Sequence, residues 1–209
     1  MLGVIRKFAL WVGLPVAFLF TLVVAGLLQE FAPDGLPTAA RDAGVPFPLK
    51  DPRIVVRIQP MTLALYDGDI LAKRYNIGYG RAPVGRVSDR ENSTPLGEFV
   101  IAGKEKREDV LCHGSRFLRF DFPTEEVAHR AWEAGAITDD DLDAILSAHA
   151  EGQEPPHDTP LGGPLGIQGN FFFFLERRFT DGSIALSNGD INELYEHVEI
   201  GTPVMILDR

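Results

Sequence analysis

The stretch TDGSIALSNGDINELYEHVEIGTPVMI, Thr180 to Ile206, decides the fold of this chain. A Gly-Ser turn and a short apolar run, IALS, open it. In the following run, DINELYEHV, Leu194 and Val198 are four residues apart, which predicts one face of a helix. The last run, TPVMIL, predicts a closing strand. The C-terminus is therefore expected to contribute both a helix and a strand.

The region before this stretch predicts mostly strands. From Arg53, apolar alternation continues on both sides of Asp67-Gly68, a dipeptide that favours a tight hairpin turn. Further strands are predicted at Gly97 to Ala102, in SRFLRFDF and at the end of PLGIQGN. Between them, Thr124 and Thr138 are candidate N-caps of two short helices, each with acidic residues in its first turn. This order predicts a mainly β, α+β domain with helical insertions.

The N-terminal region has a different composition. Phe8 to Leu28 is a run of 21 uncharged residues, enough to cross a hydrocarbon core of roughly 30 Å, and it follows Arg6 and Lys7. A cleaved signal peptide usually has a shorter apolar region and a small-x-small cleavage site. We therefore predict an uncleaved anchor at 1–28, a linker at 29–52 and one domain at 53–209. The basic residues place the domain outside the cytoplasm, which predicts a single-pass protein of the inner (cytoplasmic) membrane, facing the periplasm or the cell exterior.

Charge and cysteine content exclude several classes of partner. All 30 acidic residues but only 18 of the 20 basic ones follow Leu28, so the exported part has a formal charge of −12. Such a surface repels nucleic acid, and we predict no nucleic-acid partner. The single cysteine, Cys112, cannot form an internal disulfide, and no cysteine cluster is present to hold zinc. We predict neither a metal nor an organic cofactor.

Four segments together resemble the L,D-transpeptidase catalytic domain, or YkuD domain, of bacterial cell-wall enzymes. They are LALYDGDILAKRYNIGYGRAPVGRV, STPLGEFVI, DTPLGGPLGIQG and DGSIALSNGDINELYEHVEIGTPVMI, in this order from about Arg53 to the end. The resemblance implies a β-sandwich-like domain that acts on peptidoglycan stem peptides. It also implies a cysteine that attacks the amide before a terminal D-alanine, a histidine that assists it, and backbone N–H groups that receive the oxyanion.

Both chemical positions of this family are changed in the chain. The resemblance places the histidine at Gln168 and the nucleophilic cysteine at Ser183. It places scaffold and substrate-binding positions at Gly169, Gly182, Ile184 and Asn188, which keep the residues of the motif. A serine hydroxyl needs a base, and an amide side chain has no titratable acceptor near pH 7. We therefore predict a stem-peptide-binding or enzyme-binding adaptor whose reaction is lost or much reduced.

Two alternatives remain open. An active serine acyltransferase or amidase would use Ser183 with another base, for which His157, followed by Asp158, is the first candidate. A domain that keeps only the fold would have its cleft filled, for instance by the rings of Phe171 to Phe174. Three histidines are expected at the surface: His129, His149 and His197, the last paired with Glu193 four residues earlier. A relocated Cys112-His113 pair is disfavoured, because strand neighbours point to opposite faces.

Overall fold

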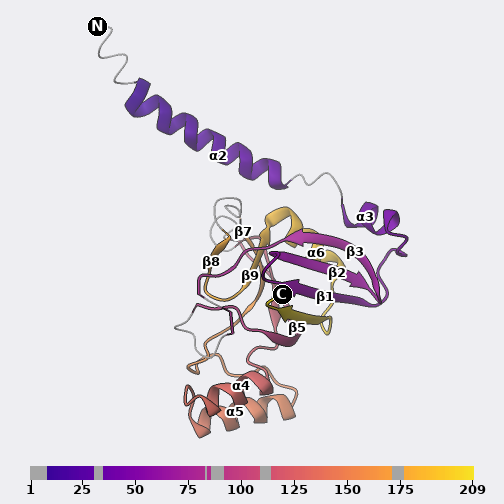
Figure 1. Cartoon of the computed structure of the whole chain (residues 1–209), viewed down its shortest axis with the longest axis vertical. Helices are drawn as coiled ribbons and strands as arrows, with labels where there is room; N and C mark the ends of the chain where they lie inside the picture. Colours follow the sequence, from indigo (N-terminus) through magenta and orange to yellow (C-terminus); the bar gives the residue numbers. More distant parts are fainter. Residues whose placement is uncertain (1–8, 31–34, 83, 86–91, 109–113, 171–176) are drawn as a thin grey trace.

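The computed structural model describes residues 9–30, 35–82, 84–85, 92–108, 114–170 and 177–209. The first described element is a π-helical turn, Ala9–Gly13, which continues into α2, Leu14–Glu30. α2 extends away from the rest of the molecule (Figure 1). Within the described ranges, no helix combines the length and the apolarity needed to cross a membrane.

The rest of the chain is built on one eight-stranded sheet with the order β3-β2-β1-β10-β5-β6-β7-β9. Its strands are β1 Pro52–Arg57, β2 Thr62–Asp67, β3 Ile70–Asn76, β5 Gly97–Lys106, β6 Arg116–Phe120, β7 Gly166–Asn170, β9 Ile184–Ser187 and β10 Pro203–Leu207. A second, two-stranded sheet pairs β4, Tyr79–Gly80, with β8, Arg178–Thr180. The mainly β architecture with helical insertions is confirmed, and the expected hairpin is the turn between β2 and β3, where Gly68 has a φ of 57°.

The C-terminal stretch holds this sheet together. β10 lies between β1, with which it is parallel, and β5, with which it is antiparallel. β5 pairs with two strands along its length: its first residues pair with β10 and its later ones with β6. β9 is parallel to β7 at the other end of the sheet order. Two strands of the quoted stretch therefore occupy separate places in one sheet.

The helices follow their capping signals closely. Thr124 caps α4, Glu125–Glu133, by accepting a hydrogen bond from the Val127 N–H. Thr138 and Asp141 form a capping box at the start of α5, Asp139–Ala150. These two helices lie together at the end of the molecule opposite α2 (Figure 1). The last helix, α6, Asn188–His197, is capped by Ser187 and buries Ile191 and Leu194 in the core.

Part of the expected linker is folded onto the domain. α3, Leu36–Asp42, lies inside the 29–52 segment, for which no fold was expected. Leu36 and Ala40 are completely buried in the same core as the sheet residues, and Val45 is only 5% exposed. The physical reason is tertiary burial, because α3 is too short to be stable alone.

Candidate active site

The turn before β9 carries Ser183 and is held by one buried threonine. The Thr180 hydroxyl donates to the Ser183 carbonyl at 2.6 Å and accepts from the Gly182 N–H at 3.3 Å. Gly182 has a φ of 128°, a conformation that favours glycine. The sequence interpretation missed Thr180, although its position three residues before Ser183 suits a local turn contact.

Ser183 points toward β7. Its residue is 7% exposed, and its Oγ accepts a hydrogen bond from the Gly166 N–H at 3.3 Å. Gly166 also packs closely against β6 on its other side, because a Cβ there would lie 2.2 Å from the Leu118 carbonyl oxygen. Among the described residues, no imidazole forms a hydrogen bond with Ser183.

Gln168 lies on β7 beside the start of β9. It is in register with Ala185, two residues after Ser183, and Ser183 lies directly before β9; the two-residue alternation of an extended chain would bring the side chains at 168 and 183 to the same face. Strands about 4.8 Å apart with a rise of about 3.3 Å per residue put the two Cα atoms roughly 8 Å apart. The Gln168 side chain is half-buried and forms no hydrogen bond with any residue that the structure describes. A residue at position 168 thus lies near position 183, but glutamine, the residue at position 168, is not a base.

The other predicted positions form the scaffold beneath these two residues. Asn188 is 2% exposed, and its Oδ1 accepts from the Ser115 N–H at 3.2 Å. A Cβ on Gly169 would lie 2.4 Å from that same Oδ1, so α6 and β7 approach as closely as a glycine permits. The Ile184 side chain is completely buried. Any contact between a ligand and Ile184 would therefore involve its backbone.

His157 is engaged elsewhere. Its Nε2 lies 2.6 Å from Glu154 Oε1, and Glu154 in turn contacts Arg119. The hydrogen bond from His157, followed by the charges of Arg119 and His157, holds the pKa of the Glu154 carboxyl below its usual range. His157 Nδ1 is buried and has no hydrogen-bond partner among the residues that the structure describes, and a Cβ on Gly163 would lie 2.7 Å from it. The candidate base is therefore paired with Glu154 and not with Ser183.

The remaining histidines differ partly from expectation. His129 is exposed, as expected. His149 is half-buried, with Nε2 at 2.8 Å from the Pro123 carbonyl oxygen. The predicted pair between His197 and Glu193 is wrong, because the His197 ring packs edge-on against Phe47. Cys112, His113 and Phe171 to Phe174 lie outside the described residues.

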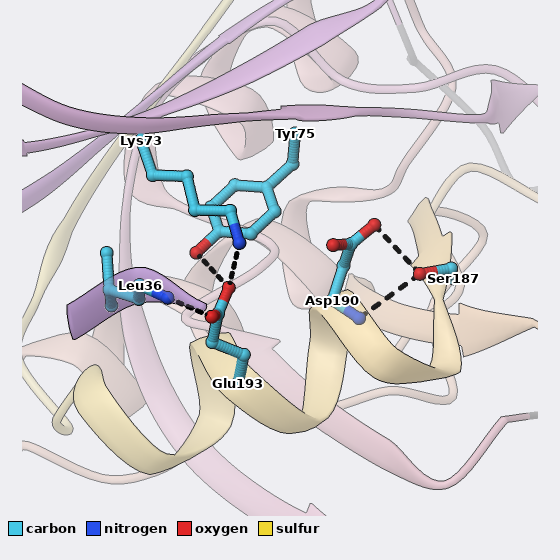
Figure 2. Close-up of polar contacts among 6 residues, drawn as sticks. All are labelled: Leu36, Lys73, Tyr75, Ser187, Asp190 and Glu193. Atoms are coloured by element: carbon cyan, nitrogen blue, oxygen red, sulfur yellow. Dashed lines mark hydrogen bonds and ion pairs between the residues drawn. The ribbon is translucent and has the colours of Figure 1, made fainter. Parts of the chain in front are cut away.

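Glu193 instead joins three elements. Its carboxylate accepts from the Leu36 N–H at the start of α3, from Lys73 Nζ at 2.6 Å and from the Tyr75 hydroxyl at 2.9 Å (Figure 2). One turn earlier on α6, the Asp190 side chain accepts from the Ser187 hydroxyl at 2.8 Å (Figure 2). Burial raises the pKa of the Asp190 carboxyl. This cluster contains an amine, a phenol and two carboxyls, yet the described part of the chain holds no group of His, Cys, Asp and Glu suited to a metal ion.

Comparison with known proteins identifies the class. The L,D-transpeptidase catalytic domain family, YkuD, matches residues 51–206. The chain therefore belongs to this family, and an L,D-transpeptidase-like fold follows from that membership. No curated protein matches the chain in sequence at a significant level.

Several solved structures are similar to the chain at low identity. Bd1075 of Bdellovibrio bacteriovorus is 14% identical over 77% of this chain and 49% of its own, with a TM-score of 0.48. A cysteine-to-serine mutant of the L,D-transpeptidase of Enterococcus faecium is 16% identical over 76% and 50%, with a TM-score of 0.45. The helical cell shape determining protein Pgp2 of Campylobacter jejuni is 16% identical over 77% and 49%, with a TM-score of 0.46. The chain thus spans about half the length of each of these three proteins.

Proposed function

We propose that this chain is a membrane-anchored, cell-wall-facing receptor that binds peptidoglycan stem peptides on an L,D-transpeptidase domain whose chemical step is lost. Family membership supports a peptidoglycan-related ligand. The loss of the reaction is inferred from Ser183 and Gln168, the residues at the nucleophile and base positions. A cell-wall enzyme is the second kind of partner that such a receptor would serve.

One observation carries the proposal: the Ser183 hydroxyl accepts a backbone hydrogen bond, and in the part of the chain that the structure describes no imidazole is hydrogen-bonded to it. A serine is a weak nucleophile until a base removes its proton during attack. A glutamine amide cannot take that proton. Absence of a general base alone removes about 10²–10⁴ in rate. The Gly166 N–H further stabilises the oxygen lone pair that would have to attack.

The alternative of an active serine enzyme is less well supported. It needs an imidazole next to Ser183, whereas the Nε2 of His157 is bound to Glu154. The Gly182 N–H, an expected oxyanion donor, already bonds to Thr180 at 3.3 Å. His157 would have to leave Glu154, and the Gly182 N–H would have to leave Thr180, before a reaction could start.

Anchoring is proposed from the apolar N-terminal region. Residues 8–28 carry no charge, and the described side chains of Trp11, Phe18 and Phe20 are 80%, 65% and 69% exposed. So much exposed apolar surface is unfavourable in water and suits a hydrocarbon environment. The proposed topology keeps Arg6 and Lys7 in the cytoplasm and the domain in the periplasm or outside the cell. The anchor is tested by membrane flotation followed by carbonate extraction. The full-length protein is expected to float with the membranes and to stay in them after carbonate treatment. Its release into the soluble fraction would contradict the anchor.

The reaction is tested by restoring it. The full-length protein in mild detergent is incubated with disaccharide tetrapeptides, and D-alanine release is followed by mass spectrometry. Unaltered protein and Ser183→Ala are expected to be equally inactive. Ser183→Cys combined with Gln168→His is expected to release D-alanine, because the two-residue alternation of an extended chain would bring the two side chains to the same face.

The single variants provide the controls. Ser183→Cys alone and Gln168→His alone are expected to react far more slowly than the combination, since nucleophile and base act as a unit. Release by the unaltered chain that disappears in Ser183→Ala would establish a serine enzyme and overturn the proposal. Binding of the tetrapeptide to unaltered protein is measured separately by ligand-observed NMR, and no binding would contradict the receptor role.

A further inference from the structure

A concave surface lies away from Ser183, on the face of the sheet that carries Val55, Val100 and Met205. This groove, about 540 Å³ in volume, lies between strands β1, β10 and β5 and the first turn of α4. Its floor contains Val55, Val100 and Met205 from these three strands. Val55 is in register with Met205, and Val100 with Pro203, so these residues form adjacent rows on one face of the sheet. Val100 and Met205 are each 37% exposed, which is a substantial apolar surface for two strand residues.

The walls of the groove are acidic. Four carboxylates line it, namely Glu98, Asp121, Glu125 and Glu126, against only Arg53 and His149 as basic groups. Arg53 pairs with Asp69 outside the groove, and the His149 ring contacts the Pro123 carbonyl. Neither Glu98 nor Glu125 forms an ion pair with a residue in the described ranges. The groove therefore has a negative rim that the chain itself neutralises only in part.

Asp121 lies deepest in this charge pattern. Its Oδ1 accepts from the Val100 N–H at 3.0 Å, which fixes the carboxyl at the floor. Burial, the largest influence, raises the pKa of this carboxyl. A cation bound next to Asp121 would replace part of the lost hydration of its carboxylate.

The groove continues along β10. A neighbouring hollow of about 410 Å³ shares Glu98, Glu126 and Met205 with it and reaches Leu207 and Asp208. Glu98 and Val100, two residues apart on β5, present a carboxylate and an aliphatic side chain to the same face. An extended peptide has the same two-residue spacing between side chains on one face.

We propose that this groove binds an extended, basic peptide segment of a partner protein, in which Lys or Arg alternates with aliphatic residues on one face. Ammonium or guanidinium groups pair with the acidic rim, while aliphatic side chains and the methylene stems of Lys or Arg cover Val55, Val100 and Met205. An acidic ligand is excluded by the same charges. Since β7 and β9 lie beyond β6 in the sheet order, this binding is independent of the proposed stem-peptide site.

The test uses fluorescence anisotropy with the full-length chain in non-ionic detergent. The probe is a fluorescein-labelled octapeptide, Lys-Lys-Val-Val repeated twice, which alternates Lys and Val on each face of an extended chain. Saturable binding is expected, with none for the same peptide in which Glu replaces Lys. Glu98→Gln combined with Glu125→Gln is expected to weaken binding roughly tenfold, because it removes two partly exposed charge pairs with Lys residues of the probe. Both residues are exposed, so the variant is expected to fold.

The matched control removes the same number of charges from the helix pair α4 and α5, outside the groove. Glu133→Gln combined with Asp140→Asn, both exposed and outside the groove, is expected to leave the affinity within twofold. Val100→Ser changes the exposed floor of the groove without changing the net charge, and it is expected to weaken binding of the probe.

An equal loss in the groove and control variants would show diffuse attraction to an acidic protein and overturn the proposal. Spermine that competes as strongly as the peptide would overturn it in favour of a small polyamine. The Ser183→Cys/Gln168→His variant should bind the probe unchanged, which separates this result from the test of the reaction.

Discussion

Gly169 shows how tightly single residues set the candidate site. A methyl group there would lie 2.4 Å from Asn188 Oδ1 and 2.8 Å from Ile191 Cγ2, on a helix that packs against the strand. Neither group can move easily, because Asn188 binds the Ser115 N–H and Ile191 is completely buried. We expect Gly169→Ala to lower the free energy of unfolding by about 1–3 kcal/mol, the usual cost of overpacking, measured by urea denaturation.

A second glycine supplies the control for this prediction. A methyl group on Gly103, in strand β5, would lie 2.7 Å from the Arg119 guanidinium, the movable end of a long side chain. Gly103→Ala is therefore expected to cost clearly less than Gly169→Ala. Equal losses would mean that the close approach of α6 and β7 is not what requires glycine at position 169.

Thr180 sets the turn on which Ser183 sits. Its buried hydroxyl donates to the Ser183 carbonyl and accepts from the Gly182 N–H. Thr180→Val keeps the side-chain volume but leaves two buried backbone groups without a partner, so we expect a loss of about 1–3 kcal/mol in urea denaturation. Thr180→Ser retains the hydroxyl and is expected to recover most of that loss. A Val variant as stable as the Ser variant would contradict this account of the turn.

Among the elements, the junction of α3, β3 and α6 is sensitive to pH. Burial, followed by the charge of Glu193, raises the pKa of the Tyr75 phenol above its usual value. In the unfolded chain this phenol loses its proton near pH 10, while the folded state retains it. Above about pH 10 the unfolded state therefore gains from proton release, and the stability of the fold decreases as the pH rises.

This linkage predicts a specific result for Tyr75→Phe. At pH 7 the variant should lose about 1–2 kcal/mol, because the hydrogen bond to Glu193 is removed. Between pH 9 and 11 its free energy of unfolding, measured in urea, should decrease less steeply than that of the unaltered protein. Tyr66→Phe, which removes a half-buried phenol with no hydrogen-bond partner among the described residues, is the control at pH 7 and should cost clearly less there than Tyr75→Phe. Identical slopes for the unaltered protein and Tyr75→Phe would rule out Tyr75 as the source of the loss of stability at high pH.

The elements also differ in how far the sequence predicts them. α4 and α5 begin after Thr124 and Thr138, as their N-cap and acidic first turns predict, because capping is local. α3 has no such signal: its N-cap is Gly35, which makes no side-chain cap, and it exists through contacts with residues far along the chain. Local patterns predict elements that are stabilised locally and miss those that depend on the assembled core.

The same division applies to the candidate site. The motif predicts positions 168 and 183, and the structure puts Gln168 on β7 and Ser183 directly before β9, the strand parallel to it. The contact of Ser183 Oγ with the Gly166 N–H and the pairing of His157 with Glu154 depend on tertiary geometry that no spacing encodes. Positions 168 and 183 therefore stay a prediction from the motif, and the hydrogen-bond partners of each side chain could not be read from the sequence.

At the scale of the whole molecule, the stable unit extends beyond the family domain. The family match begins at residue 51, yet Leu36 is completely buried in the common core. If residues 35–50 fold with the domain, Leu36→Ala should destabilise every part of it, by about 2–5 kcal/mol for a buried leucine. Trp132 provides a distant probe on α4, where it is 44% exposed and its Nε1 donates to Asp139 at 2.6 Å.

The experiment follows Trp132 fluorescence in urea, in a Trp11→Phe background that leaves one tryptophan in the chain. Leu36→Ala should shift the Trp132 transition to lower urea as a single cooperative step, because α3 and the helix pair share one core. Ile200→Ala, which trims a side chain that is 63% exposed, should leave the midpoint almost unchanged. An unchanged Trp132 transition in Leu36→Ala would mean that residues 35–50 unfold separately. The segment would then be a tether and not part of the domain, and the Glu193 contacts in Figure 2 would form without supporting the core.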